Sequence, residues 1–460
     1  MITVLTALLF GGMVAWLCAR RPWIAVMLSF LLIAYSWRVL SCTYLDLAGP
    51  VYSRQLGADV GAGWSSLSIA LADALSLAAM VLVFMAFSRA QRRAAPPLRA
   101  WSGAAEKRLR DLAAWTLIGM AACLHIEMFS RGIVPLFEGM ERYEYRDHFA
   151  GPLHLILMKY GQAIAGVLGL FFFIGKARDQ GADYRCLLAL GLIYLHLLLA
   201  GHRFSAFYSY TCFFLLAVGA VAVGVESSRS MAGSGPAILG MQERRMIGVS
   251  ILLAVALAVA GIANSYMVVR ADDEESSQDR IVERVLVQQG EMWYQTHQRV
   301  FLDAGQNEAL TYDKLFNDPI DPTFNTSIQY LMEESLGSEE ARRVLEQGTQ
   351  YAGGYPEILF ELGGQVGGFA LVFLTSCATA LLCWVLIRAT MGGCLFTAVG
   401  AIFVIHVVMV LHIGGMLNFL IHSTFFMKLA LMLLAMAWEF RDQRRRKAAI
   451  SSPFPSEQSA

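Results

Sequence analysis

Long apolar runs alternate with short polar connections along almost the whole chain. A helix needs about 20 consecutive apolar residues to cross a hydrocarbon core roughly 30 Å thick. Eleven runs meet or approach that length, so the pattern predicts an all-α, polytopic helical membrane protein. The predicted transmembrane helices cover residues 2–18, 23–40, 67–88, 111–129, 154–175, 186–200, 206–224, 246–268, 358–387, 395–413 and 417–438.

The basic residues favour one orientation for these helices. With eleven helices, Arg20 and Arg21, the connection 89–110 and the tail RDQRRRK all fall on the same side. By the positive-inside rule that side is cytoplasmic, which puts the N-terminus outside and the C-terminus inside. Arg20 and Arg21 follow the first apolar run instead of preceding it, so we interpret that run as a retained helix and not a cleaved signal peptide.

One long polar segment interrupts the apolar pattern. Residues 270–357 contain 18 Asp and Glu against 7 Lys and Arg, a balance of −11, and such a segment cannot lie in hydrocarbon. Apolar residues at helical spacing (Ile281, Val285, Met292) and the sequence SLGSEEARRVLEQG predict helices within it.

These features divide the chain into four parts. We expect transmembrane helices in 1–268, with outer loops at 41–66 and 130–153, and an acidic, helical, extracytoplasmic cap at 269–357. Three further transmembrane helices follow in 358–438, and 439–460 form a cytoplasmic tail.

Composition excludes several kinds of chemistry. The eight cysteines are scattered with no CxxC, and no HExxH, GxSxG or phosphate-binding glycine loop occurs. The sequence therefore indicates no disulfide framework, no metal site, no cofactor and no nucleotide site. Nothing in it points to nucleic-acid binding.

Positive charges on the predicted outer side are the main functional signal, because they break the rule that places cations inside. Cations in or near a span tend to mark function or ion pairing, and a polyanionic lipid headgroup would explain them. They are Arg38, Arg131, Arg142, Arg146, Lys159, Arg203, Arg270, Arg280, Arg284 and Lys428.

Simpler explanations compete for most of these residues. Arg38 and Lys159 could extend to the membrane interface, and the loop arginines could pair with Glu141, Glu144 and Asp147. Lys428 could pair with an intramembrane acid such as Asp73. For Arg203 the functional interpretation is favoured, because His196 lies two turns earlier on the same helical face.

A second signal lies where the acidic segment meets the ninth predicted helix. Glu357, Glu361 and Gln365 are spaced i, i+4 and form one polar face. The pairs Gly363/Gly367 and Gly364/Gly368 predict close packing of another helix. His412 and His422 flank the last outer turn and could titrate near neutral pH, although core or solvated histidines are more frequent.

Three elements together resemble the Wzy-type O-antigen polymerases, which join lipid-linked oligosaccharide repeat units in bacteria. These elements are the eleven-helix layout, the stretch AGHRFSAF at an outer helix end, and a large outer loop before GGYPEILFELGGQVGGFALVFL. The last stretch is similar to an E-x-G-x-x-G pattern of these polymerases and of O-antigen ligases. Ligases often have a His-Asn pair just before it, and here Gly353-Gly354-Tyr355-Pro356 stands in its place.

The resemblance implies a metal-independent glycosyltransferase of the bacterial inner membrane. A growing glycan would move from undecaprenyl pyrophosphate to the non-reducing sugar of another lipid-linked unit. Arg203 would neutralise the leaving pyrophosphate, and Glu291, Glu361 or His202 would accept the proton. The expected substrate-binding residues are Arg131, Arg142, Arg146, Lys159, Arg270, Arg280, Arg284 and Lys428. The expected partners are these lipid-linked oligosaccharides, the bilayer and a chain-length regulator protein.

Two other classes of function remain open. A transporter or flippase for a lipid-linked sugar could use the same cations, although the chain shows no internal repeat. A structural component of an envelope polysaccharide assembly complex could use the acidic cap as a docking surface.

Overall fold

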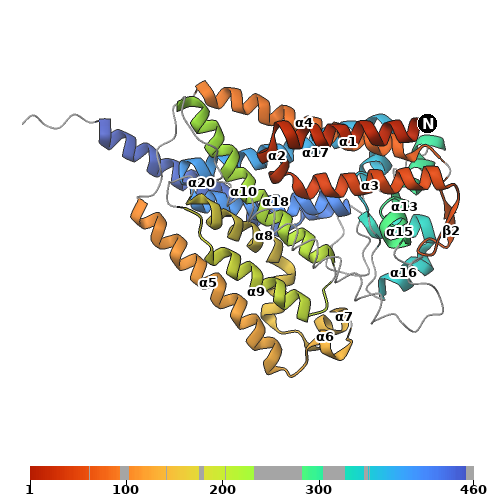
Figure 1. Ribbon diagram of the computed structural model, residues 1–460, viewed down its shortest axis with the longest axis horizontal. Coiled ribbons are helices and arrows are strands. Elements are labelled where there is room, and N and C mark those ends of the chain that lie inside the picture. The colour runs from red at the N-terminus through yellow and green to blue at the C-terminus, as the bar shows by residue number, and fades with distance from the viewer. Residues whose placement is uncertain are drawn as a thin grey trace, which may run out of the picture.

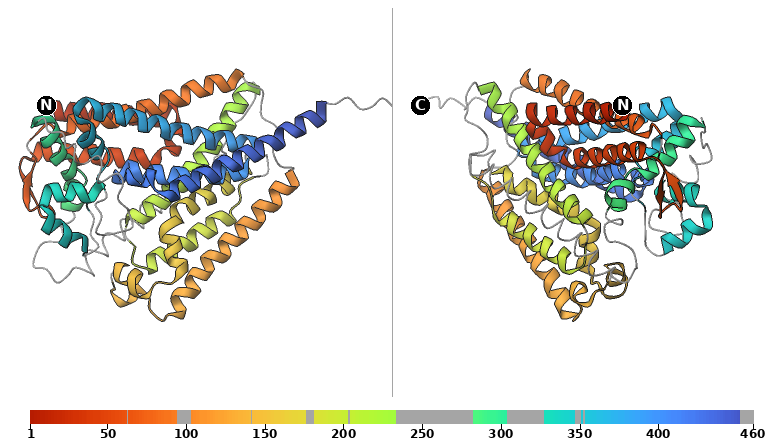
Figure 2. Two further views of the ribbon diagram at one scale, coloured as in Figure 1. Left: turned by 180° about the vertical axis from the view of Figure 1, so that it is seen from behind. Right: turned by 45° about the vertical axis from the view of Figure 1, so that its right-hand side comes forward.

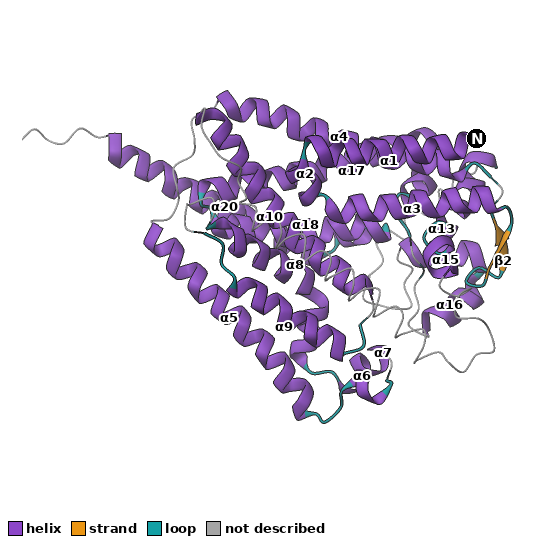
Figure 3. Ribbon diagram, viewed as in Figure 1, coloured by secondary structure: helices purple, strands orange, loops and turns teal. Residues whose placement is uncertain are grey.

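A computed structural model describes residues 1–61, 63–93, 103–140, 142–175, 181–202, 204–232, 282–303, 327–346, 351 and 353–451. Helices dominate these residues, and the strands in them form one short hairpin (Figure 3). Eight of the described helices are long and apolar enough to cross a membrane. The protein is therefore an all-α, multi-pass membrane protein. The predicted helix at 246–268 lies outside the described residues.

The N-terminal part is α1 (Ile2–Arg20), α2 (Pro22–Met27), α3 (Ser29–Ala48), the hairpin β1 (Val51–Ser53) and β2 (Ala58–Val60), and α4 (Ser65–Arg93). The predicted helix 23–40 differs in two ways: it is interrupted at Leu28, and α3 continues to Ala48. The extension packs on the acidic segment, where the Ser41 hydroxyl donates to the Leu286 carbonyl at 2.7 Å. Tertiary contact, and not hydrophobicity, therefore sets the end of α3.

The central part is α5 (Gly103–Ser130), α6 (Pro135–Glu138), α7 (Arg142–Glu144), the π-helical turn η1 (Tyr145–Phe149), α8 (Pro152–Ile174), α9 (Arg185–Leu199) and α10 (Phe204–Ala232). Helices α8 and α10 pack extensively on each other. A Cβ at Gly169 would come within 2.1 Å of the Phe214 carbonyl oxygen, so only glycine permits this approach. Helices α5 and α9 pack together and form one margin of the bundle (Figure 2).

The C-terminal part is α17 (Glu357–Gly392), α18 (Leu395–Gly414), α19 (Asn418–Ile421) and α20 (Ser423–Ser451). Helix α17 is kinked at Gly364, whose φ of 62° and ψ of −165° are not helical. The prediction that its glycines admit another helix is wrong for Gly363 and Gly368. The atoms nearest to Cβ positions built at these two glycines belong to α17 itself, at Gly368 and Phe360 respectively, so they close the kink.

The described part of the acidic segment is helical, as predicted. It consists of the π-helical turn η3 (Glu283–Val287), α13 (Glu291–His297), the π-helical turn η4 (Gln298–Leu302), α15 (Ser327–Leu336) and α16 (Ser338–Glu346). We call these elements the cap. Trp293 anchors the cap, because its side chain is fully buried, contacts the Phe360 ring edge-on at 5.3 Å and donates to the Ser65 carbonyl.

The cap lies at one end of the bundle, beside the hairpin and the N-terminus (Figure 1). The last turns of α4, α10 and α20 and the first turn of α5 lie at the other end. These helix ends adjoin the basic connections. The arrangement therefore agrees with the prediction that the basic connections lie on the same side of the membrane.

Carboxylates from neighbouring elements cap three helix N-termini. Asp46 accepts from the backbone of Ser66 at the start of α4, Glu127 from His154 in α8, and Glu439 from Thr397 in α18, at 2.8, 3.1 and 3.0 Å. The first backbone N–H groups of a helix have no partner within it, and a carboxylate also complements the positive helix end. These three acids therefore tie helices together.

Candidate functional site

Ionisable side chains from α3, α4, α17 and α18 meet beneath the cap. Arg38 on α3 donates from Nη2 to Asp73 Oδ1 at 2.5 Å and from Nε to Oδ2 at 3.3 Å. The two residues are only 6% and 0% exposed. A charge in a span costs about 2.5–3.5 kcal/mol on insertion scales, and the pairing offsets part of that cost. The alternative that Lys428 pairs with Asp73 does not hold, because Arg38 is the partner of Asp73.

Aromatic rings and hydroxyls surround this ion pair. The Arg38 guanidinium carbon lies 5.0 Å from the Tyr35 ring centroid and 6.0 Å from that of Tyr355. The Tyr35 hydroxyl hydrogen-bonds to His412 Nδ1 at 2.9 Å, and His412 Nε2 pairs with the Thr379 hydroxyl at 2.8 Å. His412, at the last turn of α18, is therefore a buried histidine with both ring nitrogens bonded, as in the core alternative for this residue.

Glu357 adds a second carboxylate to this group. It is fully buried, and its Oε2 accepts from the Gly354 backbone N–H at 3.1 Å. Its Oε1 has no hydrogen-bond partner among the described residues. Glu357 also interacts electrostatically with Arg38. We call Arg38, Asp73, Glu357, Tyr35, Tyr355 and His412 the buried ionic cluster.

Next to the cluster, Glu361 joins α17 to the cap. Its Oε1 accepts from Arg299 Nε and Nη2 at 2.9 and 2.8 Å, and from the Thr296 hydroxyl at 2.9 Å. One turn on, Gln365 donates to the Val300 carbonyl at 3.2 Å. The predicted polar face thus exists, and it docks η4 and α13.

Glu291 joins the cap to the hairpin. Its side chain is fully buried, and its Oε2 accepts from the Ser53 hydroxyl at 2.6 Å. Burial raises the pKa of Glu291 to about 8, because a carboxylate loses its solvation there. Arg284, seven residues earlier in the chain, donates to Gln288 Oε1 at 2.6 Å and so has a partner within the cap.

The histidines predicted near Arg203 form their own group between α8 and α9. His196 Nε2 and His154 Nδ1 lie 3.0 Å apart, and the His202 ring lies 5.9 Å from that of His154. Burial, with the nearby Arg142 charge, lowers the pKa of His202 to about 3. Its imidazole is therefore neutral at physiological pH. Arg203, Arg270 and Arg280 lie outside the described residues.

Two loop arginines have ordinary partners. Arg146 pairs with Asp147 at 2.6 Å on the surface, and this contact lowers the pKa of Asp147. Arg131 donates to the Phe149 carbonyl at 2.9 Å. The ion-pair explanation is confirmed for Arg146, and Arg131 stabilises the loop backbone.

The structure brings Lys159 and Lys428 together, although they come from α8 and α20. Their ammonium nitrogens lie 5.6 and 5.4 Å from the centroid of the same ring, that of Tyr160. Lys428 lies near the start of α20, which begins at Ser423, whereas the sequence had placed it three turns into its helix.

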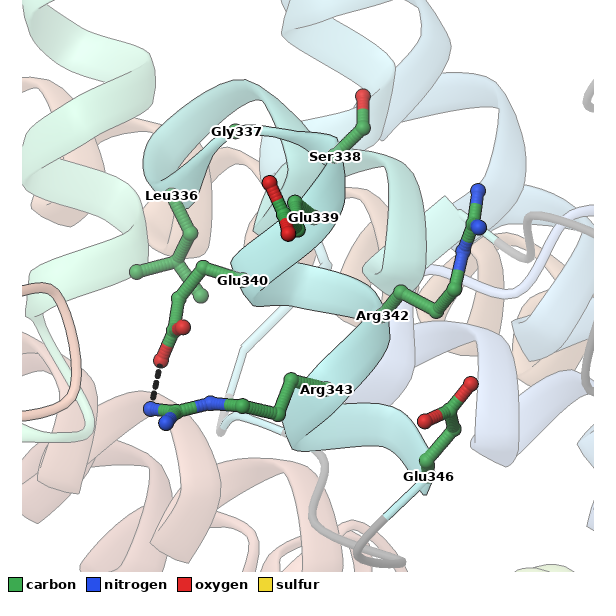
Figure 4. Close-up of a pocket in the computed structure, with 8 residues that line it drawn as sticks. All are labelled: Leu336, Gly337, Ser338, Glu339, Glu340, Arg342, Arg343 and Glu346. Carbon is green, nitrogen blue, oxygen red and sulfur yellow. Dashed lines mark hydrogen bonds and ion pairs between the residues drawn. The ribbon is translucent and has the colours of Figure 1, made fainter.

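A separate hollow of about 790 Å³ opens on the cap surface. Its lining includes the exposed ion pair of Glu340 and Arg343, 2.5 Å apart (Figure 4). None of the residues that line it belongs to the buried ionic cluster. It is lined by Leu336, Gly337, Ser338, Glu339, Glu340, Arg342, Arg343 and Glu346.

Sequence reasoning named Asp73 but not its partner, and it assigned no role to Tyr355 or His154. Asp73 was visible as a lone acid inside an apolar run, and this signal could have paired it with Arg38. Tyr355 and His154 carried no such signal, because an aromatic residue or a single histidine is common in helical membrane proteins.

Comparison with protein families matches residues 321–429 to a family of unknown function (DUF6418). This segment contains α15 to α19, and with them Tyr355, Glu357, Glu361 and His412. The chain matches no curated protein and no solved structure.

Proposed function

We propose that this protein is a membrane-embedded glycosyltransferase that polymerises lipid-linked oligosaccharide repeat units. One observation carries the proposal: ionisable side chains from four helices meet inside the apolar bundle, beside the cap. Charged residues inside a membrane bundle mark substrate or ion sites by default. The site would work at the outer face of the inner membrane, with the N-terminus periplasmic and the C-terminus cytoplasmic.

The proposed reaction needs a cation and a proton acceptor. A hydroxyl oxygen of the acceptor sugar bonds to the anomeric carbon of the growing glycan, while the bond from that carbon to the lipid pyrophosphate oxygen breaks. The pyrophosphate leaves with the electron pair, and the hydroxyl proton passes to a base. Cations held near the leaving group stabilise its developing charge, and they do not have to reorient during the reaction.

The buried ionic cluster supplies groups of both kinds. Arg38 can offer its planar donors to a phosphate, and Glu357 has an oxygen without a partner in the described region. Glu291, Glu361 and His202 remain the base candidates from the sequence. Glu291 and Glu361 are buried, so substrate would reach Glu361 only if the cap moved away from α17, and Glu291 only if the cap moved away from the hairpin.

A transporter of lipid-linked sugars is the second candidate. The interruption between α2 and α3 at Leu28 and the kink of α17 at Gly364 favour it, because broken helices are common at transport sites.

Loss of the protein from its host separates these functions. For a polymerase, deletion leaves single repeat units attached to their acceptor, whereas loss of a transporter leaves no units outside. Loss of a structural component alters only amount or chain length. A deletion strain with a normal glycan ladder would refute the polymerase.

A further inference from the structure

Lys159 and Lys428 differ from the other described membrane cations that the sequence singled out. Arg38 has Asp73 beside it, but neither lysine has an ion pair or hydrogen bond within the described part of the chain; their contacts are with the Tyr160 ring. The two ammonium groups also act on each other electrostatically. Two neighbouring like charges in low dielectric repel. A bound anion would stabilise the pair, and the described residues do not supply one.

The site opens toward lipid. Lys159 is exposed and Lys428 half-buried, and their helices both pack against α18. Beside the lysines, Ile156 on α8 and Phe426 and Met427 on α20 are 45%, 53% and 55% exposed. Exposed apolar side chains on a membrane helix face hydrocarbon, so an anion here has to reach the lysines from the bilayer.

The floor of the site is polar and aromatic. The Tyr160 ring lies 6.2 Å from that of Phe403 on α18, and His406 Nε2 contacts Gln162 Oε1 at 3.1 Å. His406 Nδ1 is buried without a partner in the described residues. His406 also interacts electrostatically with Lys428, so a buried polar group lies near this lysine.

The depth of the lysines suits a headgroup. Lys159 is seven residues into α8 and Lys428 five residues into α20, which is about 10 Å and about 8 Å along each axis. Lysine side chains at that depth reach the interface, which is where the phosphates of lipid headgroups lie.

We propose that Lys159 and Lys428 form a binding site for the phosphate group of an anionic lipid, which enters from the bilayer between α8 and α20. His406, beside Lys428, is six residues before His412 of the buried ionic cluster, or about 9 Å along α18. That the lipid is the glycan carrier rests on the proposed function; that the site binds lipid phosphate does not.

The test is equilibrium binding of a radiolabelled polyprenyl phosphate to full-length protein in phosphatidylcholine nanodiscs. Lys159→Gln and Lys428→Gln should each weaken binding by about tenfold or more, and Lys428→Arg should retain it because the charge is kept. Lys107→Gln, an exposed lysine at the opposite end of the bundle, is the matched control and should change nothing. Equal binding by wild type and both Gln variants would overturn the site.

Two further probes identify the ligand. Unlabelled polyprenol should not compete, and inorganic phosphate should compete only at far higher concentration. Equal competition by inorganic phosphate would contradict a lipid ligand, and competition by polyprenol would contradict a phosphate site. A deletion strain with a normal ladder, together with binding lost in the Gln variants, would refute the polymerase while leaving this site standing.

Discussion

At the scale of single residues, the site is centred on the buried ion pair of Arg38 and Asp73. Arg38 and Asp73 are 35 positions apart and almost fully buried. Removing one partner leaves the other as an uncompensated charge, which typically costs about 3–5 kcal/mol. Asp73→Asn should therefore lower the thermal unfolding temperature of the detergent-solubilised protein strongly.

The matched variant is Arg38→Met with Asp73→Leu. Because it removes both charges, the double variant should be more stable than Asp73→Asn alone. A double variant as unstable as the sum of its single changes would show that the two side chains do not interact.

Glu291 predicts a pH dependence of stability. Its pKa is raised in the folded protein from 4.5 to about 8, so between these values the folded state binds more protons than the unfolded state. The stabilising contribution of protonated Glu291 is thus complete below pH 4.5 and is lost as pH rises through 8. Glu291→Gln should unfold at a higher temperature than wild type at pH 9 and at a similar temperature at pH 5. Parallel pH curves for the two proteins would contradict the burial of an ionisable Glu291.

At the scale of elements, the kink in α17 depends on one glycine. Gly364 has φ 62° and ψ −165°, a region that side-chain-bearing residues enter at a cost of about 1–3 kcal/mol. Gly364→Ala should destabilise the protein by that amount in thermal unfolding. Gly367→Ala, where an added Cβ meets nothing within 4 Å, should not destabilise it. Equal stability of the two variants would show that the kink is not held by Gly364.

Sequence patterns predicted the membrane-spanning helices well and the side-chain pairings poorly. Hydropathy predicted each described membrane helix, and most predicted helix ends lie within about one or two turns of the observed ones. The reason is that the bilayer imposes length and apolarity on every span. The extension of α3 to Ala48 escaped it, since the cap and not the lipid determines that end. The pairing of Arg38 with Asp73, and the meeting of Lys159 with Lys428, depend on how helices pack, which no local period encodes.

At the scale of the whole molecule, the cap and the basic helix ends lie at opposite ends of the bundle (Figure 1). If the cap faces outward, cysteine placed at Ser338 in a cysteine-free background should react with an impermeant thiol reagent in intact spheroplasts. Cysteine placed at Lys107 should react only after the membrane is opened. The reverse pattern would invert the topology and move the proposed site to the cytoplasmic face.

The proposed function requires that the buried ionic cluster serves glycan polymerisation. The most direct measurement is the glycan ladder of a strain whose only copy carries Glu357→Gln, with membrane level and thermal stability of the variant checked. Losing a group that acts in the transition state costs on the order of 2–4 kcal/mol, about 30- to 1000-fold in rate. We predict collapse of the ladder to single repeat units, and an unchanged ladder for Glu340→Gln on the cap surface. A normal ladder from a stable, normally abundant Glu357→Gln protein would contradict the assignment of polymerisation to this cluster.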